Sequence, residues 1–443
     1  MELIIEIIIY IVVAILIGIC AAWIYLIKSM IETFTLTPYL DKFENTNNAT
    51  PKVSIILPAR NEEKYLASCL DSLIDQDYQN YEIVVIDDSS DDATGNIITD
   101  YSKKNSKIIH VSANTKPEGW MGKNWACMEG YRQATGDIIT DYSKKNSKII
   151  HVSANIKPEG WMGKNWACME GYRQATGELL LFTDADTKHS NQVISLSVSH
   201  LLSLQLDALS AIPRLLTFDF LTKVSLPMIS TFLHTRFSAI NVNNPKKKAA
   251  YFFGSFFIIT KKTYEQVGMH EGVKHEIIED GALGRKVKET GHKMRIVRGD
   301  HLIDAVWARD ASTLWHALKR LMIPLYLQSE KIAIGSFLAV LFLLFIPFPI
   351  FAITNFIPIE SISTKILYTS AAIASALIYT GAIIEVKMGL KLKLIHALFA
   401  PLGGLVVTLG FFTGLIQAKG SSTVSWRGRN YSMKDHAQSS LSI

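Results

Sequence analysis

The sequence has few cysteines and little net charge, and each shortage excludes a class of protein. Its four cysteines among 443 residues show neither the paired spacing of a zinc site nor the framework of a disulfide-stabilised secreted domain. Without aromatic or groove-reading motifs, the formal net charge of +5 is too small to indicate nucleic-acid binding. That charge suits a protein resting on an anionic membrane surface.

The N-terminus also lacks the features of a cleaved signal peptide. The first apolar stretch, Leu3 to Ile27, is too long and has neither a basic start nor a small-residue cleavage site. Three more long apolar stretches follow late in the chain: Ile332 to Phe356, Ile366 to Val386 and Leu394 to Gln417. Each is long enough to cross a hydrocarbon core, which takes about 20 helical residues. We therefore expect an N-terminal anchor at residues 1–28 and three membrane segments within residues 332–417.

Basic residues predict which side of the membrane the polar middle of the chain occupies. Lys28 and the Lys/Arg-rich middle flank the first apolar stretch, which predicts a multi-pass protein of the cell membrane with this middle on the cytoplasmic face. Four full spans would carry the basic tail, residues 418–443, to the opposite face, which its charge disfavours. A broken or re-entrant segment at Pro347 or at Pro401 would resolve the conflict.

A tandem repeat interrupts the middle of the chain. Residues 95–135 recur almost unchanged as residues 136–176. A solenoid would show three or more diverged units, so two near-identical copies indicate a recent duplication that adds one surplus helix–strand–helix unit. The first copy is joined directly to Asp88, whereas the second runs into the strand that ends at Asp186. A hybrid packing that uses parts of both copies is therefore open.

Strand and helix patterns alternate through residues 51–310. Residues 53–58 and 108–111 are typical of buried strands, and residues 66–74 place leucines on one face of a helix. This alternation predicts right-handed βαβ units and an α/β domain with a mainly parallel sheet. The following residues, 311–331, mix basic and apolar side chains and predict an interfacial segment.

Two of the apolar runs end in paired acids, Asp87-Asp88 and Asp184-Ala185-Asp186. Ligands of open α/β sheets bind beyond the carboxyl ends of the strands, so these four carboxylates should meet at one edge. They would repel one another unless a cation lay among them, and Asp-x-Asp suits a Mg²⁺ or Mn²⁺ ion that holds a diphosphate. For either pair alone, an acidic cap after a strand is the alternative.

Longer motifs resemble a known enzyme family. Residues 53–92 resemble the nucleotide-binding opening of family 2 glycosyltransferases, which have the Rossmann-like GT-A fold. Residues 160–167 together with residues 183–187 are similar to a membrane-bound branch that includes hopanoid-associated and carotenoid glycosyltransferases. Residues 276–280 resemble the acidic catalytic motif of this branch, and residues 426–431 resemble its C-terminal signature. The tandem duplication is a departure from the family pattern.

This resemblance implies a nucleotide-sugar donor, most readily a UDP-sugar. Asp184 and Asp186 would hold Mn²⁺ or Mg²⁺ against the diphosphate, with Asp186 the more direct ligand. The nucleoside would be met by Asp88 together with Asp87. The turn from Arg60 to Glu62 would contact its base or ribose.

The same resemblance implies roles for three further residues. Lys164, on a glycine-hinged loop that opens a helix, would add positive charge at the phosphates, although an ordinary solvated lysine is the alternative. Asp280 would take the proton of the acceptor hydroxyl, with Glu279 as the second candidate. Both acids also suit the N-terminal turn of a helix, and the two roles are compatible. A single base opposite the leaving group implies inversion at the sugar carbon.

Apolar segments on both sides of the polar domain indicate a lipid acceptor at the membrane. The processive members of the family carry a Gln-x-x-Arg-Trp motif before their membrane helices, and residues 315–320 lack it. The sequence therefore favours transfer of one sugar to a lipid. Processive polysaccharide synthesis is one alternative, and a non-catalytic membrane protein inactivated by the duplication is another.

Overall fold

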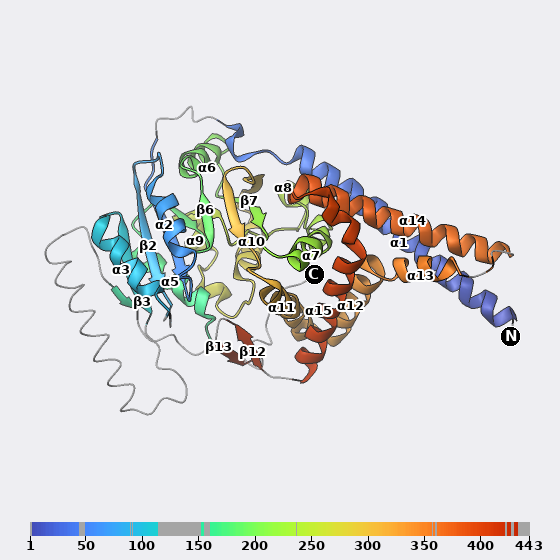
Figure 1. Cartoon of the computed structure of the whole chain (residues 1–443). Coiled ribbons are helices and arrows are strands. Elements are labelled where there is room, and N and C mark those ends of the chain that lie inside the picture. The colour runs from blue at the N-terminus through green and yellow to red at the C-terminus, as the bar shows by residue number, and fades with distance from the viewer. Residues whose placement is uncertain are drawn as a thin grey trace, which may run out of the picture.

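A computed structural model describes most of the chain. The described residues are 2–43, 49–88, 90, 92–113, 152–154, 160–235, 237–356, 358, 361–420, 423–426 and 429–432. Within them, an α/β domain built on a central sheet lies at one end and a bundle of long helices at the other (Figure 1).

The central sheet has eight described strands in the order β10-β7-β9-β5-β1-β2-β3-β4. Strand β9 runs antiparallel to β5 and β7, and the other described pairs of this sheet are parallel. This confirms the predicted α/β class with a mainly parallel sheet. The bounds are β1 (Val53–Ala59), β2 (Tyr81–Asp87), β3 (Ile108–Ala113), β4 (Val152–Ala154), β5 (Leu179–Phe182), β7 (Ala208–Ile212), β9 (Phe257–Thr260) and β10 (Met294–Arg298). A second sheet holds β6 (Thr187–His189), β11 (Ile303–Val306) and β8 (Arg214–Leu216).

Alternating side chains give the central sheet two apolar faces. Ile55 and Leu57 pack with the helices of one layer, whereas Ile56 packs with those of the opposite layer. The first layer contains α2 (Leu66–Ile74), α3 (Thr94–Lys104) and α6 (Val193–Ser203), and the second contains α5 (Gly163–Gln174), α8 (Ala239–Asn243), α9 (Lys261–Gln266) and α10 (Glu279–Glu289). Because both faces are covered, the carboxyl ends of the strands are the natural place for a site.

The described residues combine elements from both copies of the duplication. Helix α3 and strand β3 come from the first copy, and β3 pairs with β2. Helix α5 comes from the second copy and packs on β1 and β2, where a Cβ on Gly171 would lie 2.5 Å from Ile86 Cδ1. Strand β4 is the second-copy counterpart of β3 and pairs with it in parallel, Val111 opposite Val152. The residues between Ala113 and Val152 lie outside the described part of the chain.

The helix bundle contains the apolar stretches found in the sequence. Helix α1 (Glu2–Leu36) continues past Lys28, and α14 (Ile362–Ile384) and α15 (Ala400–Gly420) follow late in the chain. Among the described residues, three helical segments, Leu3–Leu36, Ile362–Gly389 and Leu394–Gly420, are long and apolar enough to cross a membrane. Helices α12 (Glu330–Leu344) and α13 (Pro347–Thr354) form a fourth if this pair, bent by 43°, is one span. The bend falls at Pro347, one of the two break positions that the sequence offered.

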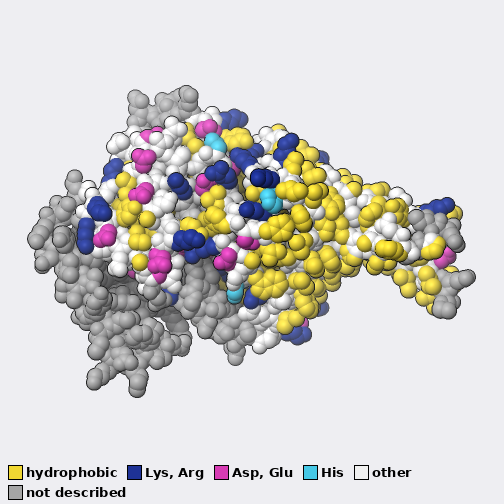
Figure 2. Space-filling model, in the orientation of Figure 1, with side chains coloured by type: hydrophobic (Ala, Val, Ile, Leu, Met, Phe, Trp, Pro, Cys, Tyr) yellow, Lys and Arg dark blue, Asp and Glu magenta, His cyan; other side chains and the backbone are white. Residues whose placement is uncertain are grey.

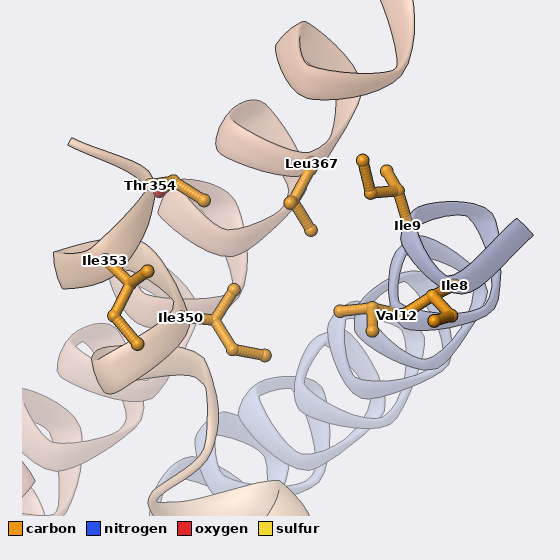
Figure 3. A pocket seen from close by; sticks show the side chains of 7 residues that line it. All are labelled: Ile8, Ile9, Val12, Ile350, Ile353, Thr354 and Leu367. Atoms are coloured by element: carbon orange, nitrogen blue, oxygen red, sulfur yellow. The ribbon is translucent and has the colours of Figure 1, made fainter. Parts of the chain in front are cut away.

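On the face shown in Figure 2, hydrophobic side chains cover most of the bundle, whereas charged side chains gather over the sheet domain. Inside the bundle, the ring of Trp23 on α1 is fully buried, and its Nε1 donates to Leu343 O at 2.8 Å. An apolar groove between α1, α13 and α14 is lined by Ile8, Ile9, Val12, Ile350, Ile353, Thr354 and Leu367 (Figure 3). Thr354 supplies one hydroxyl, and the rest of the lining is aliphatic, so the groove has no group that could bind a charged substrate. This groove is therefore not the candidate functional site.

A buried polar network joins the sheet domain to the bundle. At the end of β10, Arg298 donates to Phe34 O of α1 at 2.6 Å and pairs with Asp300 at 3.1 Å. Lys391, which follows α14, pairs with the same Asp300 at 2.6 Å. These contacts fix the sheet domain against the helices.

Candidate active site

The carboxyl ends of β1 and β2 are tied together by the residues expected to meet the nucleoside. Arg60 Nη1 donates to Asp88 O at 2.6 Å, and Asp88 N donates to Ala59 O at 2.9 Å. The Asp87 carboxylate accepts from Ser90 N at 2.9 Å, and a Cβ on Gly95 would come within 2.8 Å of it. Asp88 is buried. The two loops therefore form one rigid rim beside the sheet.

A second group gathers beyond β5, around the Lys164 ammonium. Lys164 Nζ lies 2.8 Å from Asp184 Oδ1 and 2.7 Å from Glu279 Oε1. A Cβ on Gly254 would lie 2.8 Å from Asp280 Oδ2, 3.2 Å from Lys164 Nζ and 3.5 Å from Asp184 Oδ2. Because Gly254 has no side chain, a small space remains beside it, and the charged groups of Asp280, Lys164 and Asp184 line that space. The structure brings together four of the residues that the sequence singled out.

Asn165 explains why Lys164 reaches this point. Its Nδ2 is within hydrogen-bond distance of three carbonyl oxygens, those of Val273, Lys274 and Glu276, at 2.8, 3.2 and 3.0 Å. Met162 N donates to Lys274 O at 2.8 Å. These bonds fasten the start of α5 to the segment that leads into α10, whose first residues are Glu279 and Asp280. The sequence analysis missed Asn165, because a single asparagine inside a motif carries no signal of its partners.

The charges of the cluster perturb one another. Burial, followed by the adjacent Glu279, raises the pKa of Asp280 to about 7, although Lys164 and a 2.7 Å hydrogen bond from Gly281 N pull that pKa down. Burial opposes the charge on Lys164, yet Asp184, Glu279 and Asp280 together raise its pKa well above the usual value. Lys164 is therefore a permanent cation at neutral pH, whereas Asp280 can exchange a proton there.

Asp186 points to a different cation from Asp184. Arg309 Nη2 lies 3.8 Å from Asp186 Oδ2, and the same guanidinium pairs with Glu62, whose side chain is 1% exposed. Arg309 also lies over the ring of Tyr65, 4.9 Å from its centre. The sequence analysis missed Arg309, since it stands in no motif and lies far along the chain from Glu62.

A divalent cation fits the chemistry of these groups but not their present partners. Carboxylates are the hard ligands that Mg²⁺ and Mn²⁺ prefer. Within the described part of the chain, however, no three His, Cys, Asp or Glu side chains are gathered as a ready-made metal site. Asp184 and Glu279 converge on one cation, and that cation is the Lys164 ammonium. A metal held by Asp184 would take over a position that a protein cation occupies here.

Comparison with curated proteins finds short, significant matches. The 4,4'-diaponeurosporenoate glycosyltransferase of Staphylococcus haemolyticus is 36% identical over 94 residues, which are 21% of this chain and 24% of that protein. Glycosyltransferase GlyA of Streptococcus pneumoniae is 45% identical over 60 residues, 14% of this chain and 9% of that protein. The dolichyl N-acetyl-α-D-glucosaminyl phosphate 3-β-D-2,3-diacetamido-2,3-dideoxy-β-D-glucuronosyltransferase of Methanococcus voltae is 43% identical over 67 residues, 14% of this chain and 21% of that protein. The chain thus spans a quarter or less of the length of these relatives.

Comparison with solved structures finds weak likenesses at low sequence identity. The mannosyltransferase PcManGT from Pyrobaculum calidifontis, in complex with GDP-Man and Mn²⁺, is 15% identical with a TM-score of 0.48, and the match covers 92% of this chain and 99% of that one. Residues 1–349 of S. aureus TarS in complex with UDP-GlcNAc are 13% identical with a TM-score of 0.36, covering 86% and 96%.

Two family models divide the sequence near the middle of the duplication. The model described as glycosyl transferase family 2 matches residues 54–140, and the model described as glycosyl transferase family 21 matches residues 140–438. These matches confirm the predicted glycosyltransferase. The second match covers well over half of this chain, so the chain belongs to glycosyl transferase family 21.

Proposed function

We propose that this protein is an inverting, metal-dependent glycosyltransferase that moves a single sugar from a nucleotide-sugar to a lipid acceptor at the membrane. The observation that carries the proposal is the cluster of Asp184, Glu279 and Asp280 around Lys164, at the carboxyl end of the sheet. Such a cluster provides both a site for a cationic partner of a diphosphate and a carboxylate able to accept a proton at neutral pH.

The donor would bind between the two groups of residues described above. The rim formed by Arg60, Glu62, Asp87 and Asp88 would hold the nucleoside, with a UDP-sugar the first candidate. Mn²⁺ or Mg²⁺ held by Asp184 and Asp186, with Asp186 the more direct ligand, would neutralise charge that develops on the departing diphosphate. The ammonium of Lys164 would bind the same phosphates.

Asp280 is the proposed general base. Its pKa of about 7 lets the carboxylate take a proton from an acceptor hydroxyl near neutral pH, and its hydrogen bond from Gly281 N fixes its orientation. Glu279 is held by Lys164 and would act mainly by maintaining the negative charge next to Asp280. Direct displacement by one activated hydroxyl inverts the configuration at the sugar carbon.

A lipid acceptor is supported by the position of the sheet domain on the bundle. Helices α7 (Phe220–Ser230) and α11 (Ala311–Gln328) pack against α15, and Phe218 and Phe220 are about half exposed beside them. Apolar side chains exposed next to membrane helices suit the interface of a bilayer. Two of the curated relatives are named after diaponeurosporenoate and a dolichyl phosphate, both isoprenoid compounds, which supports a lipid acceptor here. The catalytic domain would lie on the cytoplasmic face of the cell membrane.

The test is release of nucleoside diphosphate by membranes that contain the full chain. A panel of UDP- and GDP-sugars with a bacterial lipid extract would be supplied with and without Mn²⁺. The chain would be compared with Asp280→Asn and with Asp100→Asn, a matched change at an exposed carboxylate on α3. We expect Mn²⁺-dependent release that Asp280→Asn abolishes and Asp100→Asn retains, with one sugar per lipid in an inverted linkage.

Other outcomes would overturn specific parts of the proposal. Polymeric product would indicate a processive synthase, and retained configuration would exclude Asp280 as the base in a single displacement. No release from the full chain, with activity in a chain that lacks residues 95–135, would show that the duplication inactivates the enzyme.

A further inference from the structure

The Lys164 ammonium lies against Asp184, one of the carboxylates to which the proposed function assigns a divalent metal. It contacts Asp184, which follows β5, and Glu279, at the start of α10, at 2.8 and 2.7 Å. Asp280 borders the same space beside Gly254. The three carboxylates come from two separate segments of the chain and would repel one another without a cation between them.

The surroundings of Lys164 fix its backbone but leave its side chain able to move. The bonds from Asn165 and Met162 hold the start of α5 against the segment before α10. The Lys164 side chain is 22% exposed, and the Asp184 side chain is 32% exposed. Four methylene groups separate the ammonium from this fixed backbone, so it can leave Asp184 without any change in the fold.

One monovalent ammonium is a poor match for three carboxylates. A divalent ion carries twice the charge and binds several oxygens at once, but it can enter only if the ammonium withdraws. A diphosphate gives the withdrawn ammonium a new anionic partner close by. Metal alone would leave the displaced ammonium without an anion, and nucleotide alone would leave the carboxylates without a cation if the ammonium moved to the diphosphate. Metal and nucleotide therefore favour each other's binding.

We infer that Lys164 is a built-in counter-ion of the resting site, and that it must exchange Asp184 and Glu279 for the donor diphosphate before the divalent metal binds. This inference rests on the proposed function, since it assumes a metal and a diphosphate at this site. It makes metal binding weak in the absence of nucleotide and strong in its presence. Lys164 thus couples the two.

The experiment measures Mn²⁺ binding directly, by electron paramagnetic resonance of free Mn²⁺, with the full chain in detergent. Lys164→Met removes the charge, and Lys164→Arg keeps it. Lys262→Met, at an exposed position on α9, is the matched control. Without nucleotide, we expect Lys164→Met to bind Mn²⁺ about tenfold or more tightly than the unaltered chain, because a competing unit charge has been removed. Lys164→Arg and Lys262→Met should bind weakly, as the unaltered chain does.

Adding UDP or GDP distinguishes the counter-ion role of Lys164 from the proposed metal-dependent glycosyl transfer. The unaltered chain should gain Mn²⁺ affinity on addition of nucleotide, and Lys164→Met should gain much less. Equal or weaker Mn²⁺ binding by Lys164→Met would overturn the counter-ion role while leaving metal-dependent transfer intact. Absence of Mn²⁺ binding by every variant, with nucleotide present, would overturn both. A thermal unfolding curve for each variant establishes that it is folded, and Lys164→Gln provides a second neutral substitution.

Discussion

The raised pKa of Asp280 predicts an unusual pH dependence for this enzyme. Burial and the neighbouring Glu279 bring that pKa to about 7, whereas an ordinary aspartate titrates near pH 4. A general base must be deprotonated, so activity should be lost as the pH falls through 7. With a pKa of about 7, the carboxylate form makes up about a tenth of the protein at pH 6 and about nine tenths at pH 8. The value of kcat/KM, which reports the free enzyme, should therefore rise about tenfold between these pH values.

Glu279→Gln provides the matched perturbation. It removes a negative charge that raises the pKa of Asp280, so the midpoint of the profile should move below 7. The assay is the initial rate of nucleoside diphosphate release at low donor concentration, from pH 5 to pH 9 in buffers of constant ionic strength. Asp280→Asn should lower the rate about 10²- to 10⁴-fold at every pH. A midpoint near 4, or a midpoint that Glu279→Gln moves upward, would refute the assignment of Asp280 as a buried base.

Three further predictions follow from the packing. Arg309→Ala removes the guanidinium that pairs with the buried Glu62 carboxylate and should destabilise the folded chain by about 3–5 kcal/mol and raise the KM for the donor; thermal unfolding and donor titration test this, and unchanged values would show that the ion pair is dispensable. Gly381→Ala would place a Cβ 2.1 Å from the Trp23 ring and should cost about 1–3 kcal/mol, whereas Gly335→Ala meets open space and should not lower the melting temperature in detergent. Deletion of residues 95–135 should preserve or raise donor turnover, because one copy of each element suffices; loss of activity in a folded chain would show that the second copy cannot replace α3 and β3 of the first.

Local patterns in the sequence were sufficient for the individual elements of the sheet domain. Residues 53–58 and 66–74 were expected as a strand and a helix, and they are found as β1 and α2. Apolar runs bounded by polar residues report burial directly, because a strand covered on both faces has no polar side to display. The sequence also predicted that Asp88 and Asp184, which follow two strands, lie at the same edge of the sheet. Strands β2 and β5 both pair in parallel with β1, so their carboxyl ends do lie at one edge.

The partners of the site residues could not be obtained in this way. Arg309 pairs with Glu62, and Lys164 with Glu279, across large separations in sequence, and these pairings depend on how whole elements are stacked. The sequence predicted that Asp184 and Asp186 bind a metal ion. It could not predict that Lys164 and Arg309 would pair with the same carboxylates. The preference of carboxylates for a divalent metal can be predicted from residue type, whereas the cations that lie next to them depend on the fold.

The parallel pairing of β3 with β4 places the duplicated strand at the edge of the central sheet. A sheet can lengthen at its rim without disturbing the strands already in place, and the copied strand here takes its position beside its own template. Had the duplication included β1 or β5, the extra strand would have had to enter between occupied neighbours. A duplicated strand can thus be added at the edge of a sheet without displacing the strands that are already paired.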